Sequence, residues 1–505
     1  LDLGGEGRGG VQEENVFNIR TPVAIALAVR HGEPEPNQPA RVYYRRVEGT
    51  TREAKLKALE GIRALGEIPF QEAPTGWGDP FLPVARGVWS TWPLLTDLFP
   101  WQHSGVKFGR TWPIGPTREV LEARWRALLE SEDRASAFKE NDNHDIGKPY
   151  PAIQGSERLP PIRDLPPDAP HESIQRYGYR SFDRAWAIAD GRLCDAPGRP
   201  LWASFSEKQV YLASSLTEPL GEGPALSVSA YPPDKHYFCN RGGKDILPLY
   251  RDAEGQEPNL TKGLLETLAQ AYGFTPTPED FAAYVYALLA HPGYTERFRE
   301  ELRLGGPRVP LTQDPELFRE AVEVGKYLLW LHTYGERFGD RKAFQGLKGR
   351  AHWRKAPTGY PVQHRYDQMK RILHVGDGEV AEVAPEVWEF RIGRFHPLRN
   401  WLDRRKQRPG GRRSSPLDEI QPQEWTADLS REFLELIWVL EGTVGSYPRQ
   451  EALLKRVLAG PTFTVDALPQ PQPHEREAPE DPAEGNWSRE KAGQGKLFSD
   501  SVGEL

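Results

Sequence analysis

Arginine and aromatic side chains alternate in three stretches of the chain, Tyr177–Trp202, His236–Tyr250 and Val387–Lys406. The arginine guanidinium group is a planar fork of donors that fits guanine edges and phosphate oxygens. An aromatic neighbour holds that fork rigid and can itself stack on a base. The three stretches therefore predict contacts with DNA, and the candidate residues are Arg180, Arg184, Trp186, Arg199, Arg241, Lys244, Arg391, Arg394, Arg399, Arg404, Arg405 and Lys406.

A structural interpretation of the same stretches stays open. The rings would then form core, and the arginines would pair with nearby acids, as Asp183 beside Arg184 allows. Between Glu157 and Trp202 there are seven Arg and seven Asp and Glu, so this region is neutral. It cannot attract DNA by bulk charge, and any recognition there must depend on individually placed contacts.

The charge of the chain is unevenly distributed. The net charge is −7, but Arg341–Arg413 holds 18 Lys and Arg against 7 Asp and Glu, an excess of 11 positive charges. The rest of the chain must then carry −18. Such a basic segment in an acidic protein is a candidate footprint for phosphates, although a solvated basic surface or a partner for the protein's own acidic parts would look the same. Its end, "RRKQRPGGRR", is typical of an exposed loop.

Complete catalytic constellations are missing from the sequence. We find no H-E-x-x-H, G-x-S-x-G or Walker A motif, and "YPPDK" (Tyr231–Lys235) has neither the order of a methylase motif nor a second acid for a metal. The opening "LDLGGEGRGG" lacks the spacing of a dinucleotide loop. Two cysteines, Cys194 and Cys239, cannot build a disulfide framework or a four-cysteine zinc site, which favours a reducing, cytoplasmic setting. No catalytic, cofactor-binding or metal residue is predicted, and no apolar run reaches the ~18 residues of a membrane helix.

The first 68 residues predict the closing elements of an α/β sheet. The run Val23–Val29 predicts a strand or short helix buried on both sides, and Ala40–Gly49 predicts a strand. Thr50 with Glu53 predicts a capping box for a helix from about Thr51 to Leu65.

Helical and β patterns alternate in the remainder, which predicts a large α+β domain with several amphipathic helices. Asp466 marks the start of a Pro- and Glu-rich tail that predicts disorder to the end of the chain. We expect β structure in Val210–Tyr250 and Gly359–Phe390, and a long surface excursion over Asp133–Pro170. The expected helices are Thr117–Glu130, one capped by Asn259 and reaching Tyr272, one that begins at Thr277 with Asp280, one over residues 314–338, and two further helices over residues 430–443 and 448–460.

Taken together, the ordered stretches resemble the C-terminal half of type ISP restriction–modification enzymes. No single stretch is specific, but the series covers nearly the whole chain before the tail. "YGYRSFDRAW" departs from the family pattern, because Ser181 stands where relatives usually have Pro. The stretches that carry the resemblance are "LDLGG…NVFNIRTPVAIALAVR", "ARVYYRRVEGTTREAKLKAL", "SGVKFGRTWPIGPTREVLEARWRALL", "YGYRSFDRAW", "HYFCNRGGKDILPLY", "NLTKGLLETLAQAYG", "TPEDFAAYVYALLAHPGYTERFREEL", "PRVPLTQDPELFREAVEVGKYLLWLH" and "VWEFRIGRFHPLRNWLDRRK".

The resemblance implies three parts. Residues 1–68 would be the end of a Rossmann-like adenine-N6 methyltransferase domain, residues 69–465 the DNA target-recognition (specificity) domain, and residues 466–505 the disordered tail. The catalytic motif and the S-adenosylmethionine site of such an enzyme would lie upstream of Leu1, in agreement with a chain that begins "LDLGG" and has Met369 as its only methionine. The partners implied are double-stranded DNA and the upstream methyltransferase domain of the same chain, with no membrane; the presence of motor and nuclease domains stays open, because some relatives keep only methylation.

Two hypotheses for function follow. In the first, the chain reads a DNA sequence and presents a flipped adenine for methylation, with phosphate contacts mainly from Arg391–Arg413 and base contacts from residues such as Arg180, Arg184 or Arg394. In the second, the chain is a structural module that couples a methyltransferase to a motor or partner, and its arginines serve internal salt bridges.

Overall fold

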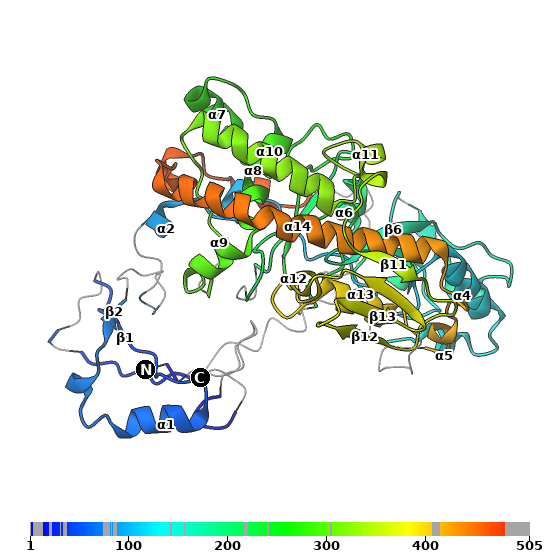
Figure 1. The fold of residues 1–505 in the computed structure, drawn as a ribbon, viewed down its shortest axis with the longest axis horizontal. Coiled ribbons are helices and arrows are strands. Elements are labelled where there is room, and N and C mark those ends of the chain that lie inside the picture. Colours follow the sequence, from blue (N-terminus) through cyan, green and yellow to red (C-terminus); the bar gives the residue numbers. More distant parts are fainter. Residues whose placement is uncertain are drawn as a thin grey trace.

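The computed structural model describes residues 2–3, 14–19, 23–30, 32–33, 38–73, 81, 83, 88–141, 144–155, 157–216, 221–239, 242–303, 306–406 and 415–479. Within these residues the fold is mixed α+β with several small antiparallel sheets, as the sequence predicts for the larger part of the chain. Figure 1 shows the described part of residues 2–73, in blue, to one side of a larger body that the orange helix α14 (Ala427–Ala459) crosses. No helix of the described residues is long and apolar enough to cross a membrane.

The N-terminal segment is held together around helix α1 (Arg52–Glu60). Its buried Lys55 donates from Nζ to the Leu3 carbonyl at 2.8 Å and to the Glu14 carbonyl at 2.6 Å. Strand β1 (Tyr43–Tyr44) pairs antiparallel with β2 (Gln71–Glu72). The described part of this segment contains one pair of two-residue strands and isolated bridges of Asp2. The predicted α/β sheet is therefore not seen in the described part of residues 2–73.

Three details of this segment correct the sequence prediction. The N-cap of α1 is Thr51, whose hydroxyl accepts from the Ala54 amide, and not Thr50. The helix ends at Glu60, because Gly61 closes it, and not near Leu65. The apolar run Val23–Val29 is not buried on both sides: Leu27 is 69% and Val29 76% exposed, since no described element packs on them.

Helices α7 (Leu264–Tyr272), α8 (Pro278–Leu289), α9 (Pro292–Arg297) and α10 (Pro315–His332) build one half of the larger body, which we call the helical half. The predicted capping box of α8 is confirmed. Asn259 does not cap α7: Gly263 does, and the Asn259 side chain instead bonds the backbone of Trp101 and Pro248.

Helix α14 is one continuous helix where the sequence predicts two. It contains Pro448, which cannot donate a helical hydrogen bond. Its apolar side is uninterrupted, with Phe433 and Ile437 in the core beside the sheet and Leu453 and Leu454 in the core of the helical half. Packing at both ends therefore outweighs the local cost of the proline and makes α14 the element shared by both halves.

Two sheets form the centre of the other half. The first has the order β3 (Ile114–Gly115), β7 (Asp183–Ile188), β6 (Ile174–Arg180), and helix α4 (Arg118–Glu130, N-cap Thr117) covers it, as predicted. The second has the order β10 (Ile246–Pro248), β8 (Tyr211–Ala213), β9 (Ser227–Ser229).

A four-stranded antiparallel sheet lies where β structure is predicted near residues 359–390, and it begins earlier, at His352. Its order is β11 (His352–Lys355), β14 (Gly378–Ala381), β13 (Ile372–Val375), β12 (His364–Asp367). The remaining helices and strands are α2 (Val88–Thr91), α3 (Leu95–Leu98), α5 (Arg134–Phe138), β4 (Tyr150–Pro151), β5 (Arg158–Leu159), α6 (Arg199–Ala203), α11 (Arg341–Gln345), α12 (Pro385–Trp388) and α13 (Pro397–Arg404).

The predicted tail is ordered further than expected. Residues 466–479 are described, and the turn Pro473–Arg476 is attached to the helical half. The Glu475 carboxylate accepts from the Lys262 amide at 2.8 Å, and Arg476 pairs with Asp97 at 2.6 Å. Specific polar contacts thus offset the Pro-rich composition up to residue 479, while residues 480–505 lie outside the described residues.

Candidate nucleic-acid interface

The hairpin β6–β7 lies at the centre of the candidate site. Phe182 in its turn has a φ of +64°, so the turn adopts a left-handed conformation that is uncommon for an aromatic residue. The Phe182 ring packs edge-on against His332 and Phe390, at 5.0 and 5.7 Å between centroids. Ser181, the departure from the family pattern, donates its amide to the Tyr237 carbonyl at 3.0 Å, and its hydroxyl bonds that of Ser227 at 2.6 Å. The hydroxyl gives this turn a buried anchor that proline could not supply.

Asp234 of "YPPDK" is a buried acceptor beneath this hairpin. Its carboxylate accepts from the Tyr177 hydroxyl at 2.7 Å, from Arg180 Nη1 at 2.8 Å and from the His236 amide at 2.7 Å. Burial and the Asp234 carboxylate raise the pKa of Tyr177 well above its usual value, so the phenol stays a donor. Asp234 therefore fixes the hairpin to the following loop.

Ion pairs tie the other side of the hairpin to α13 and α14. Arg184 donates to Glu435 at 2.7 Å and lies over the Tyr334 ring, 3.5 Å from its centroid. Arg405 meets Asp183 with two hydrogen bonds, of 2.7 and 3.2 Å. Burial disfavours the charge of Arg405, but the Asp183 carboxylate outweighs it and raises the pKa of Arg405.

A further pair on this side joins Arg176 of β6 to Glu432 of α14. Arg180 and Arg184 of the first stretch, and the preceding Arg176, are thus bound to carboxylates from the loop before His236 and from α14, far away in sequence. This is the arrangement that the structural interpretation expects for those arginines.

The three Arg and aromatic stretches converge around the hairpin. The Tyr179 ring lies between Arg180 and Arg404, with guanidinium carbons 4.2 and 4.4 Å from its centroid, and its hydroxyl accepts from Arg404 at 2.6 Å. The Cys239 thiol lies 4.0 Å from the side-chain oxygen of Asn400, which brings the second stretch against α13. Residues from 54 to 225 positions apart in the chain therefore meet here, as Arg180 with Asp234 and Arg405 with Asp183 also show.

Cations at the edge of this convergence remain accessible. Arg391 and Arg394 are exposed; Arg391 pairs with Glu222, and Arg394 makes no ion pair with any described residue. Arg399 is half-buried, lies 4.9 Å from the Trp388 centroid and pairs with Glu389. Lys244 is exposed in the second stretch. We call Lys244, Arg391, Arg394 and Arg399 the cationic rim.

The rim also perturbs two histidines nearby. Burial, with the charge of Lys244, lowers the pKa of His103 to about 4. Burial, with the charges of Arg399 and Arg391, lowers the pKa of His396 despite the opposing effect of Glu389. Burial is the larger cause of the lowered pKa of both histidines, and the neighbouring cations act in the same direction.

The other predicted residues lie in less accessible positions. Lys406 pairs with Asp403 at 2.6 Å. The Trp186 ring is half-buried beneath Arg118 and Arg176. Arg199 donates to backbone carbonyls, among them that of Gly155 at 2.8 Å, and Arg241 lies outside the described residues.

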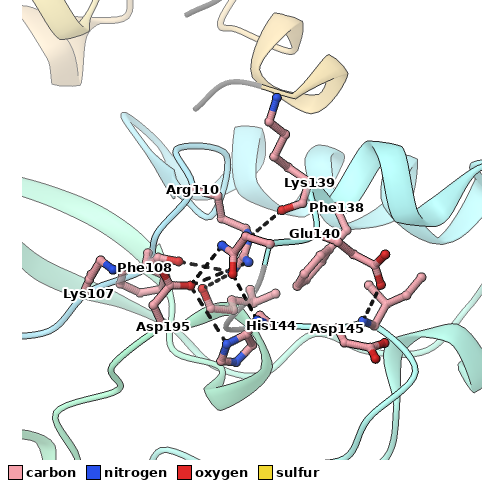
Figure 2. A network of polar contacts seen from close by, with 12 residues as sticks. Lys107, Phe108, Arg110, Phe138, Lys139, Glu140, His144, Asp145 and Asp195 are labelled. Carbon is pink, nitrogen blue, oxygen red and sulfur yellow. Dashed lines mark hydrogen bonds and ion pairs between the residues drawn. The ribbon is translucent and has the colours of Figure 1, made fainter. Parts of the chain in front are cut away.

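Sequence reasoning missed a second polar network, which Figure 2 shows. Asp195 is nearly buried and lies 3.1 Å from Lys107 Nζ, 3.8 Å from Arg110 and 4.0 Å from His144. A Cβ on Gly109 would lie 2.0 Å from the Asp195 carboxylate, so only glycine fits there. The network fixes residues 107–110 against residues 138–141, His144 and Asp195. These residues form no motif, because they come from three separate segments of the chain.

The described residues offer no group of three or more His, Cys, Asp or Glu side chains that could hold a metal ion. The described part of residues 2–73 also lacks a strand, glycine loop and helix in succession that could cradle S-adenosylmethionine. The glycine-rich stretch of residues 4–10 lies outside the described residues. The described side chains of the site offer hydrogen-bond donors, positive charge and aromatic rings.

A family comparison gives the class of protein, which is a specificity domain. A family model described as "Type ISP C-terminal specificity domain" matches residues 97–436. Because the match covers most of the chain, the chain belongs to the family of Type ISP C-terminal specificity domains, and the resemblance inferred from the sequence is confirmed.

Solved structures give the same fold. The chain is similar to DrdV in a cryoEM structure of the DrdV–DNA complex, with a TM-score of 0.58, 18% identity and coverage of 89% of this chain and 47% of that chain. It is similar to the ATP-dependent Type ISP restriction–modification enzyme LlaBIII bound to DNA, with a TM-score of 0.59, 15% identity and coverage of 92% and 30%.

A nuclease-deletion mutant of the Type ISP enzyme LlaGI, in complex with a DNA substrate mimic, gives a TM-score of 0.55, 16% identity and coverage of 92% and 43%. The chain therefore spans less than half the length of each of these three proteins. A search of curated proteins finds no match.

Proposed function

We propose that this chain recognises a specific DNA sequence for a restriction–modification enzyme and presents an adenine in it for N6 methylation. The observation that carries the proposal is the convergence of three Arg and aromatic stretches on one hairpin, edged by accessible cations. Membership of the specificity-domain family, and the DNA named in the similar structures, support it. An adenine is presented to such an enzyme by flipping it from the duplex, since its amine is not reachable while stacked.

The candidate residues divide into two roles. Arg180, Arg184 and Arg405 already bind carboxylates inside the protein, so we assign them to positioning the hairpin. Arg391 and Arg394 face solvent and can reach phosphates or base edges. Lys244 and Arg399 are assigned to the cationic rim, and Trp186, Arg199, Arg241, Arg404 and Lys406 are assigned no separate role.

We also propose that residues 1–68 are the end of the methyltransferase domain and that S-adenosylmethionine binds to the part of the enzyme that precedes them. Exposed apolar side chains in this segment favour a missing partner surface: Phe17 is 57%, Leu27 69% and Val29 76% exposed. When bound there, the cofactor would supply the methyl group. This chain would contribute the position of the DNA.

The coupling hypothesis remains the second candidate, because one observation favours it. The hairpin arginines Arg176 and Arg184 are engaged by Glu432 and Glu435 of α14, the helix that also packs into the helical half. Through such pairs, a movement of the helical half could move the hairpin without any contact to DNA.

Selection from a random-sequence duplex pool separates the two hypotheses. The 505-residue chain is incubated with the pool, and the bound DNA is sequenced. We expect one enriched asymmetric motif, and we expect Arg394→Gln to relax a position of it or weaken its enrichment, by ~1–3 kcal/mol for a base contact. Arg299→Gln, an exposed arginine of the helical half, is the matched control and should recover the wild-type motif. A folded wild-type chain that enriches no motif would contradict the proposal and favour coupling.

A further inference from the structure

The four-stranded sheet β11–β14 has one face that is packed and one that is not. On the packed face, Trp353 donates from its indole nitrogen to the Ser430 carbonyl of α14 at 3.1 Å, and its ring lies 5.7 Å from that of Phe433. Leu373 and Val380 belong to the same core. The register pairs Trp353 with Val380 and Val380 with Leu373, so these residues share the face toward α14.

The strand pairing places a row of polar residues on the opposite face. Arg365 lies opposite His374, His374 opposite Glu379, and Glu379 opposite Lys355. The row crosses all four strands from one edge of the sheet to the other, which is roughly 14 Å at ~4.8 Å between strands. Cations stand at its two ends, and the His374–Glu379 pair, 3.5 Å apart, lies between them.

A β-bulge adds a further cation to this face. In a regular strand Lys355 would point to the same side as Trp353, because successive side chains alternate. The register shifts between Trp353 and Lys355, so that Arg354 and Lys355 both lie on the outer side. Both side chains are exposed. Bulges re-aim side chains in this way at functional edges of sheets.

Several cations on this sheet have no carboxylate partner. Among the described residues, Arg354, Arg365 and Arg371 make no ion pair, and all three are exposed. Lys355 and Lys370, in contrast, pair with Asp377 and Asp367. Arg371 stands in the β12–β13 turn with a φ of +52°, beside the most exposed large apolar side chain, Met369. Arg354 and Arg365 lie on the two edge strands of one sheet, and both guanidinium groups are exposed. They could donate hydrogen bonds to oxygens of two different phosphate groups.

We propose that this sheet, through Arg354 and Arg365 on its outer face and Arg371 in the β12–β13 turn at its end, is a second contact for the backbone of double-stranded DNA. It shares no residue with the cationic rim, and its three arginines lie in the basic segment Arg341–Arg413 but are not among the individual candidates named from the sequence. The inference rests on the proposed function and deepens it: the rim lies beside the recognition hairpin, and the sheet adds attraction that does not depend on base sequence.

Binding to a random-sequence duplex as a function of salt tests this inference. The triple variant Arg354→Gln, Arg365→Gln, Arg371→Gln of the whole chain is compared with wild type by fluorescence anisotropy. Removing one phosphate contact should lower the slope of log affinity against log salt by ~0.9, so the triple variant should have a slope smaller by about 2.7 and bind random DNA at least tenfold more weakly at low salt. The motif enriched from a random pool should stay the wild-type motif.

The matched control replaces three exposed arginines of the helical half, Arg297→Gln, Arg299→Gln and Arg449→Gln, and should leave the slope unchanged. Each single sheet variant is measured as well, so that a folding defect of the triple variant cannot decide the outcome. If wild type and control bind DNA and the sheet variants bind with the same affinity and slope, the inference is overturned while the proposed function stands. If wild type itself binds no DNA, both are overturned.

Discussion

Arg405 shows how the candidate site depends on individual buried charges. Its side chain is 3% exposed and forms a two-point hydrogen-bonded pair with Asp183, which is 4% exposed. The guanidinium also lies 3.9 Å from the Trp401 centroid. A buried pair contributes little net stability, but removing one partner leaves an uncompensated charge inside the protein.

We therefore expect Arg405→Ala to lower the free energy of unfolding by about 3–5 kcal/mol, because Asp183 stays behind without a partner. Urea unfolding followed by tryptophan fluorescence measures the change. Arg394→Ala, at an exposed arginine of the rim, should stay within ~0.5 kcal/mol of wild type. The double variant Asp183→Ala, Arg405→Ala should cost clearly less than the sum of the two single variants. Additive single costs would show that the pair does not act as a unit.

The clusters of arginine and aromatic residues could be named from the sequence, but the partners of their side chains could not. It placed Arg184 in a candidate cluster and suggested Asp183 as its partner, but Arg184 binds Glu435, 251 positions away, and Asp183 binds Arg405. On neighbouring strand positions side chains point to opposite faces, so adjacent residues could not have paired. Only the long-range packing of α13 and α14 could have supplied this information.

At the scale of elements, the close approach of α8 and α10 depends on Gly325. A Cβ at this position of α10 would lie 1.8 Å from the Ala283 carbonyl oxygen of α8. The two helices could not keep their spacing with any larger residue there. Helix α10 also carries His332, which packs on Phe182 of the hairpin turn. A change in the spacing of α8 and α10 would therefore also displace a residue that supports the candidate site.

Gly325→Ala should therefore destabilise the protein by about 1–3 kcal/mol or more, through overpacking of the α8–α10 contact. Gly445 in α14 is the matched control, since nothing lies within 4 Å of its Cβ position. Gly445→Ala should be neutral or stabilising by up to ~1 kcal/mol, the difference in helix propensity. Thermal unfolding followed by circular dichroism compares both. Equal effects of the two substitutions would mean that the contact does not limit the helix spacing.

Elements with a strong local signal could be predicted from the sequence, and those decided by packing could not. The caps of α4 and α8 follow from Thr117 and from Thr277 with Asp280, whose side chains satisfy amides within the same turn. Helix α14 was expected to break before Pro448, because a local rule cannot include the two cores that it joins. Residues 466–479 were expected to be disordered for the same reason, since their contacts lie far away in sequence.

At the scale of the whole molecule, the basic segment Arg341–Arg413 lies within a chain of acidic net charge. Its buried Arg405 holds the hairpin through Asp183. Its exposed arginines lie at the cationic rim and on the four-stranded sheet. Helix α14 connects this region to the helical half (Figure 1). The structural interpretation therefore applies to the buried arginines, and our proposal of DNA contact concerns the exposed ones.

The most direct test of the DNA-recognition account is hydrogen exchange, measured by mass spectrometry, of the whole chain with and without a duplex carrying the motif recovered by selection. We predict slower amide exchange on DNA binding in residues 236–246 and 387–406, with little change in α7, α8 and α9. Protection confined to the helical half, with those two segments unchanged although the DNA is bound, would contradict the account.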